Sequence, residues 1–128
     1  MPEVDVPLFA AAVFTGLTCY LVVFQAAVAL GAPLGRYTLG GRWSGPLPAA
    51  MRPLAVVQGA MAVAMAAAVL DRSGWINLGW PAWTFWAAIG VCALSVLANA
   101  ATPSRPERRL GLPVASLMLL SALAVGWG

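Results

Sequence analysis

Four long apolar segments constrain this chain more than any other feature of its sequence. They cover about residues 6–30, 53–70, 81–101 and 112–127, and none contains a charged residue. Such segments cross a hydrocarbon layer about 30 Å thick as helices that rise about 1.5 Å per residue, and the last and shortest does so with little tilt. Lipid offers no hydrogen-bond partner to a free backbone, so helices are the expected structure. The sequence predicts one all-α domain over residues 1–128: a polytopic membrane protein with a compact bundle of four transmembrane helices.

The composition supports lipid rather than water as the surrounding solvent. Hydrophobic residues make up 62% of the chain and charged residues only 9%, against about 25% charged in an ordinary soluble domain. The net charge of +3 comes from seven arginines and no lysine, a usage typical of GC-rich bacterial genomes. These arginines lie in loops between the apolar segments, where membrane topology explains them better than nucleic-acid binding.

Residues that start or stop helices stand at the boundaries of the segments. Asp5 is predicted to cap the first helix, and Gly31 with Pro33 to end it. Proline is tolerated in a first helical turn because its missing N–H has no partner there. Such prolines open the other three segments: Pro53, Pro81 and Pro113. The second and third helices are predicted to end at Asp71, Ser73 and Gly74, and at Thr102 and Pro103, respectively.

The first segment is interpreted as a retained helix, although Ala27 and Ala29 resemble a signal-peptide cleavage pattern. The residues before it include Glu3 and Asp5 and no positive charge, whereas a signal peptide begins with a basic region.

Arginine is distributed very unevenly between the two sides of the predicted bundle. Loops 31–52 and 102–111 share one side and carry six of the seven arginines, whereas the side with both termini carries only Arg72. The positive-inside rule then places these two loops in the cytoplasm and both termini outside, in a multi-pass protein of a bacterial inner membrane. The tryptophans fit two interfacial belts: Trp75, Trp80, Trp83 and Trp127 outside, with Trp43 and Tyr37 inside. The bias also argues against a dual-topology dimer.

Uncharged polar residues are the only candidates for a ligand site inside the helices. The chain has no histidine, and no Asp or Glu lies within an apolar segment. This argues against a metal site, a proton relay and a Ser-His-Asp arrangement, and no cofactor is expected. The candidates for ligand binding are Gln25, Gln58, Asn99 and Ser116, which all fall in the cytoplasmic third by depth, and Thr18, which shares a helix face with Gln25. They predict either interhelical hydrogen bonds or a polar pocket open to the cytoplasm.

The loop 31–52 is rich in Gly and Pro, which argues against an α-helix there. Glycines at positive φ beside arginines can form an anion-binding nest, and basic clusters attract anionic lipid headgroups. The candidates for headgroup or anion binding, from both loops of that side, are Arg36, Arg42, Arg52, Arg105, Arg108 and Arg109. Glu107 is a candidate partner for a loop arginine. The loop has no Walker-type Gly-Lys-Ser/Thr, so no motif supports nucleotide binding.

Small residues along the second helix offer a face for close helix packing. Ala60, Ala64 and Ala68 recur every four residues, which suits packing within the bundle, a homo-oligomer or a protein partner. Cys19 and Cys92 both fall in apolar segments and are interpreted as small hydrophobic residues rather than as a disulfide.

The loop motifs resemble those of a group of uncharacterised small bacterial four-helix integral membrane proteins. The resemblance rests on Gly31-Ala32-Pro33-Leu34-Gly35, Gly40-Gly41 and Gly45-x-Leu47-Pro48, and on Asn99-x-x-Thr102-Pro103-Ser104 with Glu107-Arg108. It covers most of the chain and implies the same topology. The group has no assigned activity, so the resemblance implies no function.

Three functions remain open from the sequence. The first is an accessory or assembly subunit without catalytic machinery that binds partners through its bundle face or cytoplasmic loop. The second is a small transporter or binding protein for an apolar or neutral ligand, held by Gln25, Gln58 and Asn99. The third is an enzyme acting on a lipid headgroup, with arginines holding phosphate. The chain offers neither an evident nucleophile nor a general base for it.

Overall fold

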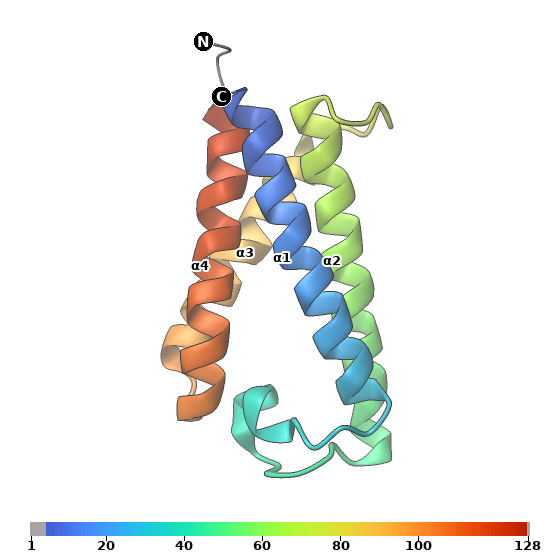
Figure 1. Cartoon of the computed structure of the whole chain (residues 1–128), viewed down its shortest axis with the longest axis vertical. Coiled ribbons are helices and arrows are strands. Elements are labelled where there is room, and N and C mark those ends of the chain that lie inside the picture. The colour runs from blue at the N-terminus through green and yellow to red at the C-terminus, as the bar shows by residue number, and fades with distance from the viewer. Residues whose placement is uncertain (1–4, 128) are drawn as a thin grey trace.

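The computed structural model describes residues 5–127, which form a compact bundle of four helices. The helices are α1 (Val6–Ala29), α2 (Arg52–Ser73), α3 (Ala82–Ala101) and α4 (Arg105–Trp127). Each runs antiparallel to the next, so α1 begins and α4 ends at the same end of the bundle (Figure 1). All four are long and apolar enough to cross a membrane. The shortest, α3, has 20 residues and is about 30 Å long. The predicted all-α four-helix bundle is confirmed.

Most of the helix ends follow the predicted signals. Asp5 caps α1, with its Oδ1 accepting a hydrogen bond from Leu8 N at 3.1 Å. Gly31 and Gly74, just beyond the ends of α1 and α2, have φ of 96° and 90°. Only glycine adopts this left-handed backbone without strain, so these positions stop the helices. Glu3, which the sequence places before the first helix, lies outside the described residues.

The predicted start of the fourth helix is wrong. Helix α4 begins at Arg105 rather than near residue 112, so most of the predicted loop 102–111 is helical and Pro113 lies inside the helix. The cause is a cap formed by Ser104, whose Oγ accepts from Glu107 N at 3.2 Å and whose carbonyl accepts from Arg108 N at 3.0 Å. A Ser with a Glu three residues later is a typical helix start. The helix therefore extends into the charged region, and α4 is longer than α3.

The four helices pack closely at one end and separate toward the other. At the end with the termini, a core forms around Phe14 and Phe85, both almost completely buried, with Val69 and Val125 beside them. Toward the other end, α1 with α2 and α3 with α4 stay together as pairs, while α1 and α4 spread apart (Figure 1). The separation leaves space between the two helix pairs.

The long connection from α1 to α2 folds back beneath this space. It contains three short 3₁₀ turns and no α-helix: η1 (Gly35–Tyr37), η2 (Leu39–Gly41) and η3 (Ala49–Met51). A second small core of Val28, Leu47 and Ala55 fixes it under α1 and α2. Gly35 is required because a Cβ there would collide with the carbonyl oxygens of Trp43 and Gly45. The end of the bundle that this connection closes is the loop end.

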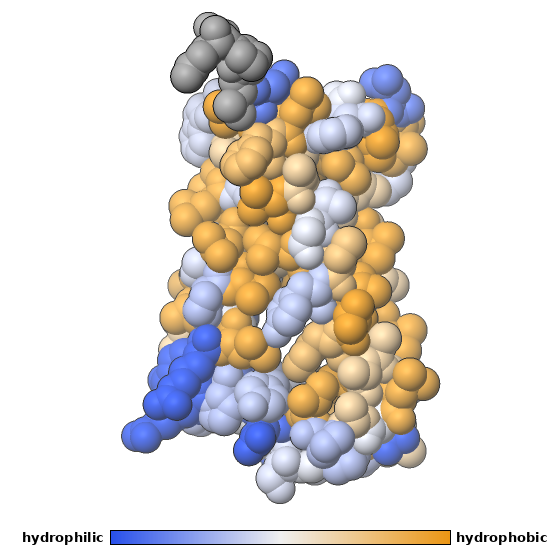
Figure 2. Space-filling model, viewed as in Figure 1, coloured by the Kyte–Doolittle hydropathy of each residue, from blue (hydrophilic) through white to orange (hydrophobic). Residues whose placement is uncertain are grey.

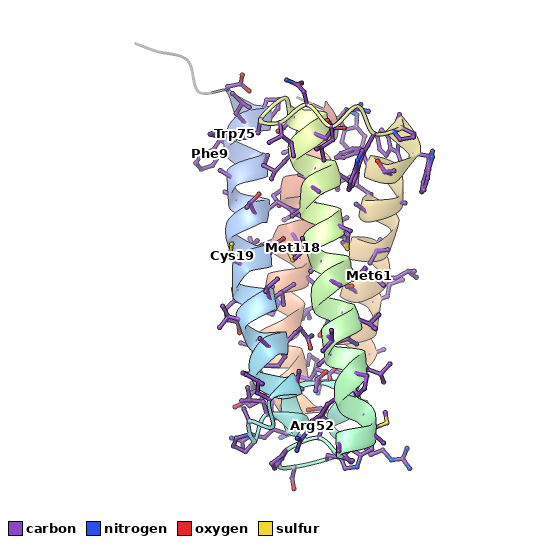
Figure 3. The ribbon with its side chains drawn as sticks, turned by 90° about the vertical axis from the view of Figure 1, so that its right-hand side faces the viewer. Phe9, Cys19, Arg52, Met61, Trp75 and Met118 are labelled. Carbon is purple, nitrogen blue, oxygen red and sulfur yellow. The ribbon has the colours of Figure 1, made fainter. Side chains whose placement is uncertain are left out.

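The opposite end is held by the connection from α2 to α3. The Asp71 carboxylate accepts from Leu78 N at 2.7 Å and from Trp80 N at 3.1 Å, which fixes this connection over the end of α2. Trp75 Nε1 donates to Leu8 O at 2.8 Å and so ties the connection to α1. Figure 3 shows Trp75 and Phe9 at this end and Arg52 at the loop end.

Candidate functional site

A cavity of about 670 Å³ lies between the two helix pairs in the half of the bundle nearer the loop end. All four helices and the η1–η2 segment contribute to its wall. The face in Figure 2 is hollowed in its lower half, where the helices separate. The volume is within the range of about 300–1,000 Å³ that is usual for small-molecule sites. A bundle filled throughout by side chains would show no such space.

Gln25 and Gln58 meet at the cavity wall and join α1 to α2. Gln25 Nε2 donates to Gln58 Oε1 at 2.9 Å. The other amide atom of Gln25, Oε1, is buried and accepts no hydrogen bond from the described residues. A buried acceptor without a partner costs about 1–3 kcal/mol. The pair therefore combines an interhelical hydrogen bond with an unused acceptor.

Asn99 brings a third amide to the cavity from α3. Its Nδ2 donates to Ser95 O at 2.7 Å, one turn earlier in the helix. Its Oδ1 points at Gly111 of α4, where a Cβ would collide with it. The glycine lets the amide enter the contact between α3 and α4. Gln25, Gln58 and Asn99, predicted to form one polar cluster, thus line one cavity.

The η1–η2 segment closes the cavity at the loop end, and α4 holds it there. Gly40 N donates to Glu107 Oε2 at 2.8 Å, and Ser104 Oγ donates to the Arg36 carbonyl at 2.5 Å. Gly41 lies so close to Ser104 that a Cβ would come within 2.5 Å of the serine Cβ. These contacts need the first turn of α4 to be helical, so the early start of α4 and the closed floor depend on each other.

Most polar side chains of the cavity wall lie toward the loop end, beside apolar ones such as Leu39 and Leu110. The part nearest the middle of the bundle is formed by Leu21, Met65, Cys92 and Met118, and Figure 3 labels Met118 among the helices. The part nearest the loop end has the three amides together with Thr38, Thr102 and Glu107. Among the described residues that line the cavity, Glu107 is the only charged one.

Comparison of the chain with family models, with curated proteins and with solved structures finds no match. The interpretation of the cavity therefore rests on its own chemistry.

Two of the predicted ligand-binding residues lie elsewhere. The buried Thr18 hydroxyl donates to the Phe14 carbonyl at 3.0 Å, four residues earlier in α1, which is ordinary behaviour for threonine within a helix. Ser116 is half-buried on α4 and does not line the cavity, whereas its neighbour Ala115 does. Thr18 shares a face of α1 with Gln25, but it lies two turns nearer the end with the filled core, whereas the rotation of α4 turns Ser116 away from the cavity.

The six predicted headgroup-binding arginines gather at the loop end, but none of the described arginines lines the cavity. Arg36 and Arg42 lie over the rings of Tyr37 and Trp43, at 5.1 and 5.6 Å from the ring centroids. Arg52 Nε donates to Leu47 O at 3.0 Å and its guanidinium packs on Gly31, so it holds the connection in place. The others lie in the first two turns of α4: Arg105, Arg108 and Arg109.

Sequence reasoning missed Thr38 and the role of Glu107. It placed Glu107 in a loop opposite an arginine, but the carboxylate accepts from Gly40 N and forms no ion pair among the described residues. The Ser104-x-x-Glu107 spacing was the signal that could have identified the helix start. No local pattern marks Thr38, since only the folding of the connection brings it to the cavity.

Proposed function

We propose that this protein is a small membrane-embedded binding protein, or the binding unit of a transporter, for an uncharged ligand held in the cavity. The observation that carries the proposal is the cavity itself, with three amides in one wall and an unpaired oxygen on Gln25. The cavity is therefore the reason to prefer ligand binding over the accessory role that the sequence alone favoured.

Several features support binding rather than catalysis. The polar groups at the cavity are amides, hydroxyls and one carboxylate already bonded to Gly40 N. Amides and hydroxyls donate and accept hydrogen bonds at neutral pH without changing charge. The arginines, which a phosphate-directed enzyme would use, lie outside the cavity.

The expected surroundings are a bacterial inner membrane, with the arginine-rich loop end in the cytoplasm and the start of α1 and the end of α4 outside. Six arginines at one end support this orientation through the positive-inside rule. Exposed arginines of the loop end would then meet anionic lipid headgroups.

The test is binding of the uncharged dye Nile red to the purified full-length protein, counted by native mass spectrometry after release from detergent. We expect one dye molecule per chain, and loss of at least tenfold in affinity in the triple variant Gln25→Leu, Gln58→Leu, Asn99→Leu. Ser116→Leu is the matched control, because Ser116 lies on α4 away from the cavity. Unchanged binding in the triple variant would overturn the proposal.

A second variant tests the proposal independently if the triple variant does not fold. Ala115 is buried on the cavity wall, so Ala115→Phe fills the space without removing a polar group. Circular dichroism and thermal unfolding report whether each variant folds. A folded Ala115→Phe variant that binds the dye as the parent does would also contradict the proposal.

A further inference from the structure

The order of polarity along the cavity matches that of a lipid in the leaflet at the loop end. The apolar part lies toward the middle of the bundle and the polar part toward the arginine-bearing loops, which is where lipid headgroups are. A ligand with an apolar tail and a polar head would therefore lie parallel to the lipids of that leaflet. A small polar solute would leave the apolar part unfilled.

The cavity also reaches the side of the bundle, where lipid would be. Tyr20 on α1 and Met61 on α2 both line it, yet 41% and 46% of their surfaces are exposed. The hollow in the face of the bundle in Figure 2 shows that the cavity opens sideways between the helix pairs. A ligand can then enter from the bilayer without crossing the loops that close the floor.

The charges at the floor exclude an anionic head. A phosphate or carboxylate in the cavity would meet the Glu107 carboxylate and no arginine. Burying a charge without a partner, beside a like charge, is strongly unfavourable. None of the loop-end arginines lines the cavity; Arg36 and Arg42 lie over Tyr37 and Trp43, and Arg52 donates to the backbone of the connection.

The free hydrogen-bonding groups of the cavity wall fit a ligand head that both donates and accepts hydrogen bonds. The amide NH₂ of Gln58, whose oxygen accepts from Gln25 Nε2, can donate to a ligand hydroxyl. Gln25 Oε1 is buried and accepts nothing from the described residues, so it meets that hydroxyl only if its side chain turns and gives up the bond to Gln58. An uncharged hydroxyl head meets both requirements.

The volume of about 670 Å³ and the length of the cavity fit a ligand with a single tail. From Glu107 to Met118, both cavity-lining residues of α4, the helix rises about 16 Å. We infer that the ligand is an uncharged single-chain lipid with a hydroxyl head, of the monoacylglycerol class, bound head-down against Gln25, Gln58 and Asn99. This inference rests on the proposed function.

The experiment compares three probes with the same ten-carbon chain on the full-length protein at pH 9, again by native mass spectrometry. They are 1-decanoylglycerol, which has an uncharged head with donors; methyl decanoate, which has no donor; and decanoate, which is anionic at this pH. We expect 1-decanoylglycerol to bind at least tenfold more tightly than either of the others.

The variant Glu107→Gln tests how the charge of Glu107 affects the choice between ligand heads. Its amide oxygen can still accept from Gly40 N, while the like charge facing decanoate is gone. We expect decanoate affinity to rise by roughly tenfold relative to 1-decanoylglycerol affinity in the same variant. An unchanged preference in this variant would show that Glu107 does not select the head.

The outcomes separate this inference from the proposed function. Equal affinity for all three probes, or no binding of any of them while Nile red binds, would overturn the lipid class and leave a ligand-binding cavity. Failure of Nile red and of all three probes would overturn both.

Discussion

At the residue scale, the predicted amide cluster and its exceptions have one physical explanation. Gln25, Gln58 and Asn99 could be brought together from sequence because their depths agree and amides seek partners in lipid. Ser116 had a suitable depth as well, but the rotation of α4 about its axis cannot be derived from hydropathy when lipid and core are both apolar. Thr18, chosen because it shares a helix face with Gln25, lies too far from the loop end to line the cavity. A polar residue is placed correctly only where both its depth and its face are known.

Gly111 provides a test of how Asn99 is held. In Gly111→Ala the new Cβ displaces Asn99 Oδ1, so the amide must turn away and lose its bond to Ser95 O. The gain of about 1 kcal/mol from replacing a helical glycine is then offset by the lost hydrogen bond. We expect Nile red affinity to fall by about three- to tenfold.

Gly90→Ala is the control for that change. Gly90 is also within a helix, α3, and a Cβ added there would meet no other atom within 4 Å. This variant should leave dye binding unchanged and be more stable than Gly111→Ala by about 1 kcal/mol in thermal unfolding. Equal stability and equal binding of the two variants would mean that Asn99 is not fixed by its contact with α4.

At the element scale, α4 and the connection from α1 to α2 form one unit at the loop end. Apolar length predicted three of the four helices closely, because their charged or glycine-bearing ends coincide with the ends of the apolar segments. It failed for α4, whose first two turns carry Arg105, Glu107, Arg108 and Arg109. There the start of the helix depends on the Ser104 cap, which is a local interaction, and on tertiary hydrogen bonds with Arg36 and Gly40. Hydropathy does not detect either kind of polar interaction.

Ser104→Ala tests this unit. The variant removes the cap of α4 and the hydrogen bond to the Arg36 carbonyl, at a cost of about 0.5–2 kcal/mol for the cap alone. We expect faster amide hydrogen exchange over residues 35–41 and 105–109, with little change in the middle of the bundle. Ser44→Ala, at an exposed position of the same connection, is the control. Faster exchange confined to 105–109 would show that the connection is held by other contacts.

At the scale of the whole molecule, the bundle is built differently at its two ends. One end has a filled core around Phe14 and Phe85 and a connection fixed by Asp71, while the other has separated helices, a cavity and a docked loop. Four apolar helices predicted the bundle but not this asymmetry, which depends on where side chains fail to fill the space. The filled half can thus supply stability while the other half keeps the space that the proposed ligand would occupy.

The orientation of the bundle decides which leaflet can supply that ligand. The cavity lies in the half of the bundle that the arginine-rich connection closes, so a cytoplasmic loop end means entry from the inner leaflet. In a Cys19→Ala, Cys92→Ala background, Ser44→Cys and Asn77→Cys place single thiols at exposed positions of the two ends. A membrane-impermeant maleimide added to intact bacterial spheroplasts should label Asn77→Cys and leave Ser44→Cys unlabelled until the membrane is opened. The reverse pattern would place the cavity in the outer leaflet, and labelling of both before opening would contradict a single orientation.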